Sequence, residues 1–203
     1  MKNKIKQIFC EMPALDNTNM GLSSKKANVA GGRTREEDVQ GKYEATQDDW
    51  SHIKDQDLPD GSRIEWYKDH MVSDVRGFLL SESDEIMGLI AGTTRPYISE
   101  LPSFLKIHLV LVFDEHQGEG YGVALYTGAL NLFGGVVSDS TLTDASLGVW
   151  KKMSKKYPVY KLAMDTKTRK YTNLRQIKDL DAEMGNGREP FIMTKKPYSL
   201  NLA

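Results

Sequence analysis

The chain has a single cysteine, Cys10, among its 203 residues, which excludes a disulfide framework and a multi-cysteine zinc site within one chain. No apolar run approaches the roughly 18 residues of a membrane span, and the basic first residues lack the apolar segment of a secretory signal. The chain also lacks an excess of charge of one sign, since it has 27 basic and 28 acidic residues. This balance argues against nucleic-acid binding through global charge. We therefore expect a cytoplasmic protein, neither secreted nor membrane-embedded and without a strong nucleic-acid signal.

Apolar residues are scarce near the N-terminus. Between Asp16 and Gln40 there is almost no aromatic or β-branched residue, so this stretch cannot bury enough surface to offset its ordering entropy. We expect residues 1–40 to form a flexible arm, which a protein partner could order, and residues 41–203 to form one domain. An unremarkable ragged terminus is the other interpretation of the same stretch.

From residue 43 onward the hydrophobic pattern predicts strands and helices that alternate. The run Lys106–Phe113 is short, β-branched and apolar on both faces, as in a central buried strand. The order predicts an α/β fold (α+β layers), with helices packed on a mixed sheet. Other strands are expected at Ile64–Tyr67, Val75–Leu80, Glu85–Ala91, Val136–Ser138, Val159–Met164 and Pro190–Thr194, and helices at Ala45–Lys54, Tyr121–Phe133, Thr143–Lys155 and Leu174–Met184.

A glycine-rich turn, Gln117-Gly118-Glu119-Gly120-Tyr121-Gly122, joins the central strand to the next helix. The first turn of a helix has unpaired N–H groups at the positive end of its dipole, and glycine lets a ligand approach the backbone closely. The pattern therefore indicates a phosphate or diphosphate site. It lacks the lysine of a P-loop, and its spacing and late position disfavour a dinucleotide fingerprint. A tight turn without a ligand is the structural alternative.

The segment VLVFDEHQGEGYGVALY resembles motif A of the GNAT family of N-acetyltransferases, in which Gln/Arg-x-x-Gly-x-Gly/Ala follows a strand and opens a helix. Gln117, Gly120 and Gly122 fill its fixed positions. The resemblance covers roughly Val75 to Thr194 and implies a GNAT-like mixed, splayed β-sheet flanked by helices. The strand end before Asp139 and the tryptophan of the next helix are similar to small GNAT-like proteins of tailed phages.

The resemblance implies acetyl-CoA as a co-substrate and no metal. The backbone of Val110, Leu111 and Val112 would pair with the pantetheine arm in the splayed sheet, as a peptide pairs with an open strand edge. The turn would hold the diphosphate on its N–H groups. The residues assigned to the cofactor in that turn are Gln117, Gly118, Glu119, Gly120, Tyr121, Gly122 and Val123.

The resemblance leaves the catalytic groups open. Some family members have a glutamate where this chain has Lys106, and His108 follows two residues on. Others have one at the position of Ser138, beside Asp139. His108 and Asp139 are therefore the candidate bases, although His108 is also typical of a packed strand histidine and Asp139 of a helix cap. The tyrosine that often protonates the leaving thiolate corresponds to Trp150, which has no hydroxyl.

Three classes of function follow from these observations. The first is an N-acetyltransferase that moves an acetyl group from acetyl-CoA to a primary amine of an unidentified protein or small molecule. The second is a catalytically silent GNAT-like binding or structural protein, for example a phage particle or host-interaction component, working in the host cytoplasm or the virion. The third is an unrelated α/β binding module. The intact glycine turn favours the first class, whereas Trp150 favours the second.

Overall fold

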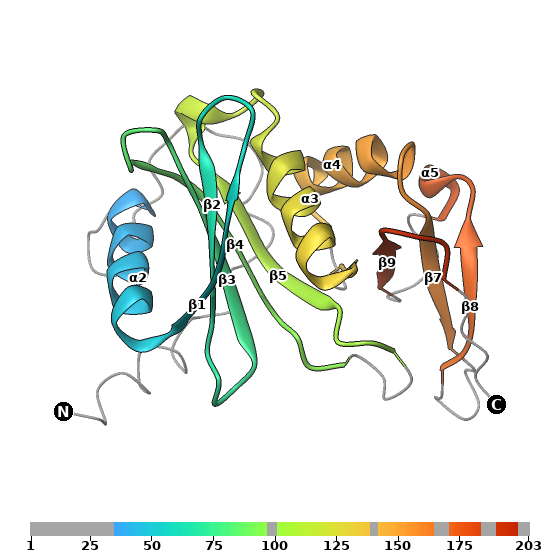
Figure 1. Cartoon of the computed structure of the whole chain (residues 1–203). Coiled ribbons are helices and arrows are strands. Elements are labelled where there is room, and N and C mark those ends of the chain that lie inside the picture. The colour runs from blue at the N-terminus through green and yellow to red at the C-terminus, as the bar shows by residue number, and fades with distance from the viewer. Residues whose placement is uncertain (1–34, 97–100, 139–141, 165–170, 184–189, 199–203) are drawn as a thin grey trace.

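A computed structural model of the chain describes residues 35–96, 101–138, 142–164, 171–183 and 190–198. Within these ranges nine strands form one mixed sheet in the order β1-β2-β3-β4-β5-β6-β9-β7-β8 (Figure 1). Among the described strands, β5 and β6 pair in parallel and all other neighbours are antiparallel. The strands are β1 (Ser51–Asp57), β2 (Arg63–Lys68), β3 (Asp74–Leu80), β4 (Ile86–Thr93), β5 (Leu105–Val112), β6 (Gly135–Val137), β7 (Val159–Met164), β8 (Tyr171–Ile177) and β9 (Phe191–Thr194).

Helices cover both faces of the sheet, as Figure 1 shows. Helix α2 (Arg35–Asp49) lies on one face, whereas α3 (Tyr121–Phe133) and α4 (Asp144–Ser154) lie on the other. Alternation along β2 separates the two cores, because Trp66 packs on the α3 side and Tyr67 on the α2 side. The other helical elements in the described ranges are the short α5 (Leu180–Glu183) and the 3-10 turn η2 (Asp114–His116). The predicted fold class, a mixed sheet flanked by helices, is confirmed.

The sequence predicts element boundaries well where hydrophobic spacing and a capping residue indicate the same end. The strands predicted at Val75–Leu80 and Glu85–Ala91 are confirmed as the antiparallel pair β3 and β4. Helix α3 ends as predicted at Gly134, which is left-handed (φ 73°) and donates its N–H to the Leu130 carbonyl at 2.9 Å. Thr143 is the N-cap of α4, and its Oγ1 accepts the Ser146 N–H at 3.2 Å.

The helix predicted over Ala45–Lys54 is wrong at both ends. Helix α2 already begins at Arg35, and Ser51–Asp57 forms the edge strand β1. Thr46 does not cap a helix start, since it lies within α2 and its hydroxyl donates to the Lys42 carbonyl at 2.6 Å. Acidic residues in the first turn complement the helix dipole, and the sparse stripe Val39, Tyr43, Thr46, Trp50 at spacings of four, three and four faces the sheet.

The helix predicted over Leu174–Met184 is also wrong in its first half. That part is β8, in which Leu174 pairs with Leu162 of β7, and only Leu180–Glu183 is helical. The spacing of Ile177 and Leu180 suits a helix, but pairing with a partner strand outweighs local periodicity. Both side chains are nevertheless buried in the main core.

Candidate functional site

The sheet opens beside the central strand β5. Its pairing with β6 is limited to Leu105↔Val136 and Lys106↔Val137, although β5 runs on to Val112. In Figure 1 the strands β9, β7 and β8 stand apart from β1–β5, joined to them through β6. The expectation of a strand buried along its whole length is therefore wrong for its second half. From residue 109 to 112 the side chains are only half-buried, because no described strand covers that edge.

The three residues predicted to meet the pantetheine arm lie on this open edge. Val110 and Val112 pack toward the α3 side of the sheet, and Leu111 packs toward the α2 side. The two cores therefore fix the side chains of these residues. No described strand pairs with their backbone on the β6 side, so its N–H and carbonyl groups can bind a ligand. A backbone edge of this kind can bind an extended amide-bearing chain by strand addition.

A β-bulge lies where the sheet begins to open. Across β4 and β5, Ala91 pairs with Leu109 while Gly92 pairs with Ile107, so His108 is the extra residue. A bulge changes the facing of the strand, and here it moves Leu109 and Leu111 to the α2 side. A Cβ on Gly92 would overlap the Lys106 carbonyl oxygen, so the close approach of β4 requires a glycine at this position. The sequence contained the glycine but no signal for the bulge.

Beyond the C-terminal end of β5, the side chain of Gln117 holds the glycine-rich turn in place. The Gln117 amide donates to the Val112 carbonyl at 3.1 Å and to Asp114 Oδ1 at 2.8 Å. These bonds join the end of the strand to the start of the turn. Gly118 (φ 87°) and Gly120 (φ 97°) are both left-handed, a conformation that other residues adopt at a cost of about 1–2 kcal/mol.

The start of helix α3 presents free backbone donors. Gly120 is the N-cap, and the first backbone bond of the helix runs from Ala124 N–H to the Gly120 carbonyl at 3.0 Å. In the described part of the chain no acceptor satisfies the N–H groups of Tyr121, Gly122 and Val123. A Cβ placed on Gly118 or Gly120 would meet no atom of the described residues within 4 Å, so that part of the chain leaves this corner open. Gly122 serves a different purpose, since its Cβ would lie 3.3 Å from Val149 of α4.

The charges around the turn are mixed. The segment 114–123 contains no lysine or arginine, so an anion there would be held by amides and the helix dipole. Asp60 of the β1–β2 turn raises the pKa of the Tyr121 hydroxyl. The hydrogen bonds that Ser62 donates to Asp60 Oδ1, and then the Tyr121 hydroxyl, lower the pKa of Asp60. Glu119 is exposed and lies 4.0 Å from the His116 ring.

The candidate base His108 lines a shallow pocket of about 290 Å³ on the α2 face of the sheet. Asp74 of β3 contributes to the same pocket, and its pKa is raised by burial and by Asp69, against the lowering effect of His108, Arg76 and Arg95. The other candidate base, Asp139, lies outside the described residues. The remaining residues that line the pocket are Val72, Thr93 and Arg95.

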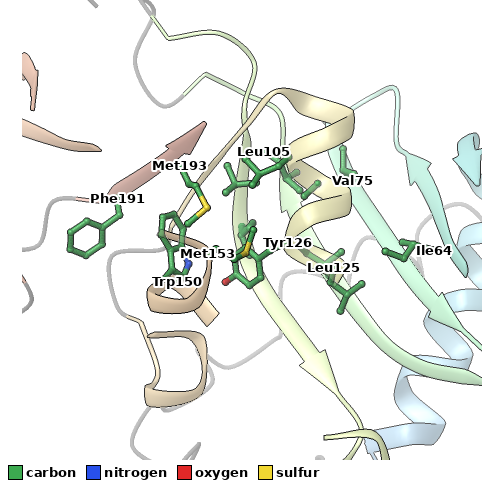
Figure 2. Close-up of a cluster of buried hydrophobic side chains, with 14 of the residues drawn as sticks. Ile64, Val75, Leu105, Leu125, Tyr126, Trp150, Met153, Phe191 and Met193 are labelled. Carbon is green, nitrogen blue, oxygen red and sulfur yellow. The ribbon is translucent and has the colours of Figure 1, made fainter. Parts of the chain in front are cut away.

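Two residues at positions linked to catalysis by the resemblance have structural roles here. Ser138 is buried, and its Oγ accepts the Phe191 N–H at 2.9 Å, which fastens the end of β6 to β9. Trp150 is fully buried, with its ring 6.0 Å from Tyr126 and 6.3 Å from Phe191 (Figure 2). Trp150 therefore fills the core rather than facing the open edge of β5.

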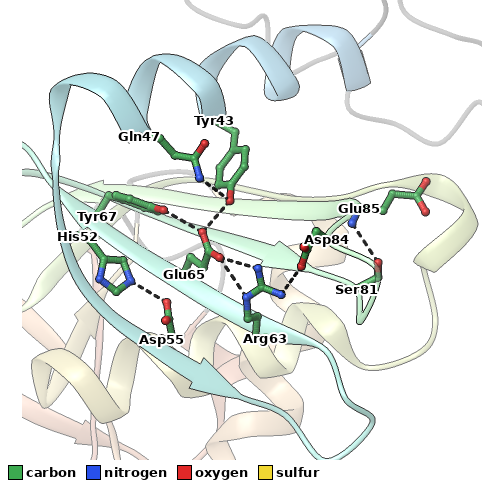
Figure 3. A network of polar contacts seen from close by, with 10 residues as sticks. All are labelled: Tyr43, Gln47, His52, Asp55, Arg63, Glu65, Tyr67, Ser81, Asp84 and Glu85. Atoms are coloured by element: carbon green, nitrogen blue, oxygen red, sulfur yellow. Dashed lines mark hydrogen bonds and ion pairs between the residues drawn. The ribbon is translucent and has the colours of Figure 1, made fainter.

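A buried carboxylate fastens α2 to the sheet (Figure 3). Glu65 accepts hydrogen bonds from Tyr43 at 2.7 Å and from Tyr67 at 2.8 Å, and Arg63 donates to its other oxygen at 2.7 and 3.0 Å. Burial and then Glu65 raise the pKa of the Tyr43 hydroxyl. Arg63 also pairs with Asp84 at 2.6 Å, which connects the network to the β3–β4 turn.

A second and larger depression, of about 630 Å³, lies between α2 and the far ends of β4 and β5. The sequence did not predict this depression, although the acidic residues that α2 contributes to it are present in the sequence. Phe113 in its wall is five residues beyond His108, which is roughly 17 Å along a strand. Its acidic side chains are Glu36, Glu37, Glu44, Glu85 and Glu115.

The described residues lack two further kinds of feature, a metal site and a membrane-spanning helix. No group of three or more histidine, cysteine, aspartate or glutamate side chains in those ranges is arranged to hold a metal ion. None of the described helices combines the length and the apolar character needed to cross a membrane.

No protein-family model and no curated protein match the sequence. Solved structures of the spermidine N-acetyltransferase SpeG from Vibrio cholerae align with the fold. Its chimera with hSSAT is 13% identical over 61% of this chain and 66% of that chain, with a TM-score of 0.36. Its complex with CoA and spermine is 10% identical over 61% of this chain and 66% of that chain, with a TM-score of 0.35.

The aligned part thus spans just under two thirds of those SpeG chains. Likeness at this identity and TM-score establishes neither a family nor a substrate for this chain, and none of these structures bears on the kinship with tailed-phage proteins.

Proposed function

We propose that the chain is an N-acetyltransferase that moves an acetyl group from acetyl-CoA to a primary amine. One observation carries the proposal: the open edge of β5 and the free amides of α3 lie at the two ends of the same short stretch of chain. A coenzyme with a diphosphate at one end of an extended amide-bearing arm and a thioester at the other has the matching layout. The GNAT-like sequence Gln117–Gly122 forms the turn at the diphosphate end.

The chain's residues have distinct roles in this proposal. The N–H groups of residues 118–123 hold the diphosphate, and the backbone of Val110, Leu111 and Val112 pairs with the pantetheine arm. Holding both reactants in place lowers the entropic part of the barrier, and a backbone N–H near the bulge polarises the thioester carbonyl. His108 accepts the proton from the attacking amine. Asp139 stays a candidate for that role from the sequence alone.

A binding protein without catalysis is the second candidate, and Trp150 favours it. The indole occupies a fully buried position and carries no group that protonates a thiolate. In this alternative the coenzyme site is retained while turnover is lost. Binding and turnover must therefore be measured separately.

Thermal unfolding with and without acetyl-CoA tests the coenzyme site. A ligand at a hundred times its dissociation constant stabilises the folded state by about 2.7 kcal/mol, so the melting temperature should rise. Gly120→Ala places a methyl group in the proposed diphosphate site and should reduce the rise. Gly134→Ala is the matched control, because Gly134 has the same left-handed backbone at the other end of α3 and the same open surroundings.

The outcomes separate the two candidates. A rise that Gly120→Ala reduces and Gly134→Ala preserves, together with thiol release in the presence of amines, supports the transferase. The same rise without thiol release from any amine supports the binding protein. No rise with acetyl-CoA or CoA contradicts both.

A further inference from the structure

The pocket beside His108 brings together groups of opposite charge from three adjacent strands and their ends. Asp74 begins β3, Thr93 ends β4, and these two residues pair directly. Arg95 follows β4, and His108 lies in the bulge of β5. Asp74 shares the α2 face with Arg76, which donates to Thr46 of α2 at 2.5 Å.

Two of these side chains have no close partner in the part of the chain that the structure describes. Among the described residues, the Asp74 carboxylate accepts no hydrogen bond, and Arg95 forms no ion pair within 4 Å. Elsewhere the chain closes such pairs, as where Arg63 holds both Glu65 and Asp84. Asp74 is half-buried, and burial raises the pKa of its carboxyl. A carboxylate and a guanidinium that line one pocket, without an ion pair among the described residues, are suited to a ligand with both charges.

The position of the pocket connects it to the open edge of β5. His108 lies two residues beyond Lys106, where the pairing with β6 ends. The same residue therefore adjoins the edge assigned to the thioester and lines the pocket. The larger acidic depression is lined by Phe113, which follows the end of β5 and lies roughly 17 Å from His108 along the chain, away from the bulge.

We propose that this pocket binds the acceptor and that the acceptor is a free α-amino acid. Asp74 and Thr93 receive its ammonium group, and Arg95 binds its carboxylate. This inference rests on the proposed transferase function and narrows its substrate class.

The step balances with these groups. The ammonium gives one proton to the imidazole of His108, and the resulting amine attacks the thioester carbonyl. The new N–C bond forms as the C–S bond breaks, and the electron pair leaves on sulfur. The amide nitrogen gives its second proton, through water, to the thiolate, and the products are an N-acetylated amino acid and free CoA.

Thiol-release kinetics with the common amino acids, their carboxamides and the corresponding decarboxylated amines test the proposal. We expect a KM at least about tenfold lower for an acid than for its amide, because one charge-assisted pair is lost in the amide. Arg95→Ala should raise KM for the acid by about tenfold or more and leave KM for the amide unchanged. Arg95→Lys should restore part of the loss. Lys178→Ala, which removes an exposed positive charge beyond β8, is the control and should change neither value.

Asp74→Asn gives a second readout. It should raise KM for acid and amide alike, since both carry the ammonium group, and Asp48→Asn on the exposed side of α2 is its control. Equal KM values for acid and amide, or an equal effect of Arg95→Ala on both, would overturn the inference.

Calorimetry with acetyl-CoA on the same samples distinguishes failure of the amino-acid pocket from failure of the proposed transferase function. Coenzyme binding and amine turnover without a preference for the carboxylate contradict the amino-acid pocket alone. Absence of coenzyme binding contradicts the proposed function itself. Coenzyme binding with no amino acid accepted also overturns the amino-acid pocket.

Discussion

Gly92 of β4 lies so close to the carbonyl oxygen of Lys106 in β5 that no other residue fits without moving one of the two strands. The contact lies at the bulge that makes His108 the extra residue of β5. The bulge is thus held by a position that has no side chain. The close contact between β4 and β5 lies at Lys106, which is also the last residue of β5 that pairs with β6.

Gly92→Ala should therefore destabilise the protein. We expect a loss of about 1–3 kcal/mol in the free energy of unfolding, the usual range for overpacking. Urea denaturation measures it. Gly41→Ala is the control, because Gly41 lies within α2 with nothing within 4 Å of an added Cβ, and alanine there should stabilise by about 0.5–1 kcal/mol. Equal effects of the two substitutions would show that the close approach at the bulge is not as described.

The cap of α4 gives a second prediction. Thr143→Ala removes the oxygen that accepts the Ser146 N–H and should cost about 1 kcal/mol of stability. Thr143→Ser keeps the acceptor and should recover most of the loss. Urea denaturation of the three proteins provides the comparison, and an alanine variant as stable as the serine variant would contradict the cap.

Tyr43 gives a prediction with a pH dependence. Tyr43→Phe removes the bond to Glu65 and should cost about 1–3 kcal/mol near neutral pH. The folded-state pKa of Tyr43 is raised above its ordinary value of 10.0, so this contribution is complete below pH 10 and is lost as the pH rises beyond it. The stability difference between wild type and Tyr43→Phe should therefore shrink above pH 10.

Urea titrations at several pH values measure that difference. Tyr157→Phe is the control, since its hydroxyl bonds to no described residue, and it should change stability little near neutral pH. A difference that grows above pH 10 would contradict the sign of the effect.

Trp150 tests the distinction between a core residue and a catalytic position. Trp150→Ala should cost about 3–5 kcal/mol, because it removes a fully buried ring between Tyr126 and Phe191. Trp50→Ala should cost less, since Trp50 is only half-buried and stacks on Arg76. Urea denaturation of both variants decides the point, and a Trp150 variant of nearly unchanged stability would show that the ring lies outside the core.

The sequence predicted the elements whose local signals agree with their surroundings. Helix α3 was predictable at both ends, because apolar spacing and Gly134 indicate the same boundaries. Helix α2 was not, because its single sparse stripe is outweighed by charged residues, and its attachment depends on Glu65 far away in the chain. Leu174 was misplaced because a strand depends on its partner, which local periodicity does not reveal.

The same limits apply to the candidate site. The glycine turn was predictable because left-handed backbone and free amides follow from residue type and order. The opening of β5 and the bulge at His108 depend on which strands pair and where pairing ends. The pocket that joins Asp74, Arg95 and His108 depends on the register of three strands, so no local pattern indicated it.

Amide chemical shifts during a titration with acetyl-CoA test the central claim most directly. The claim predicts shift changes at residues 118–123 and at 110–112, the two ends of the proposed coenzyme site. Changes at only one of these stretches would leave no continuous site along β5 and would contradict the claim. Unchanged shifts at both, at saturating acetyl-CoA, would contradict it outright.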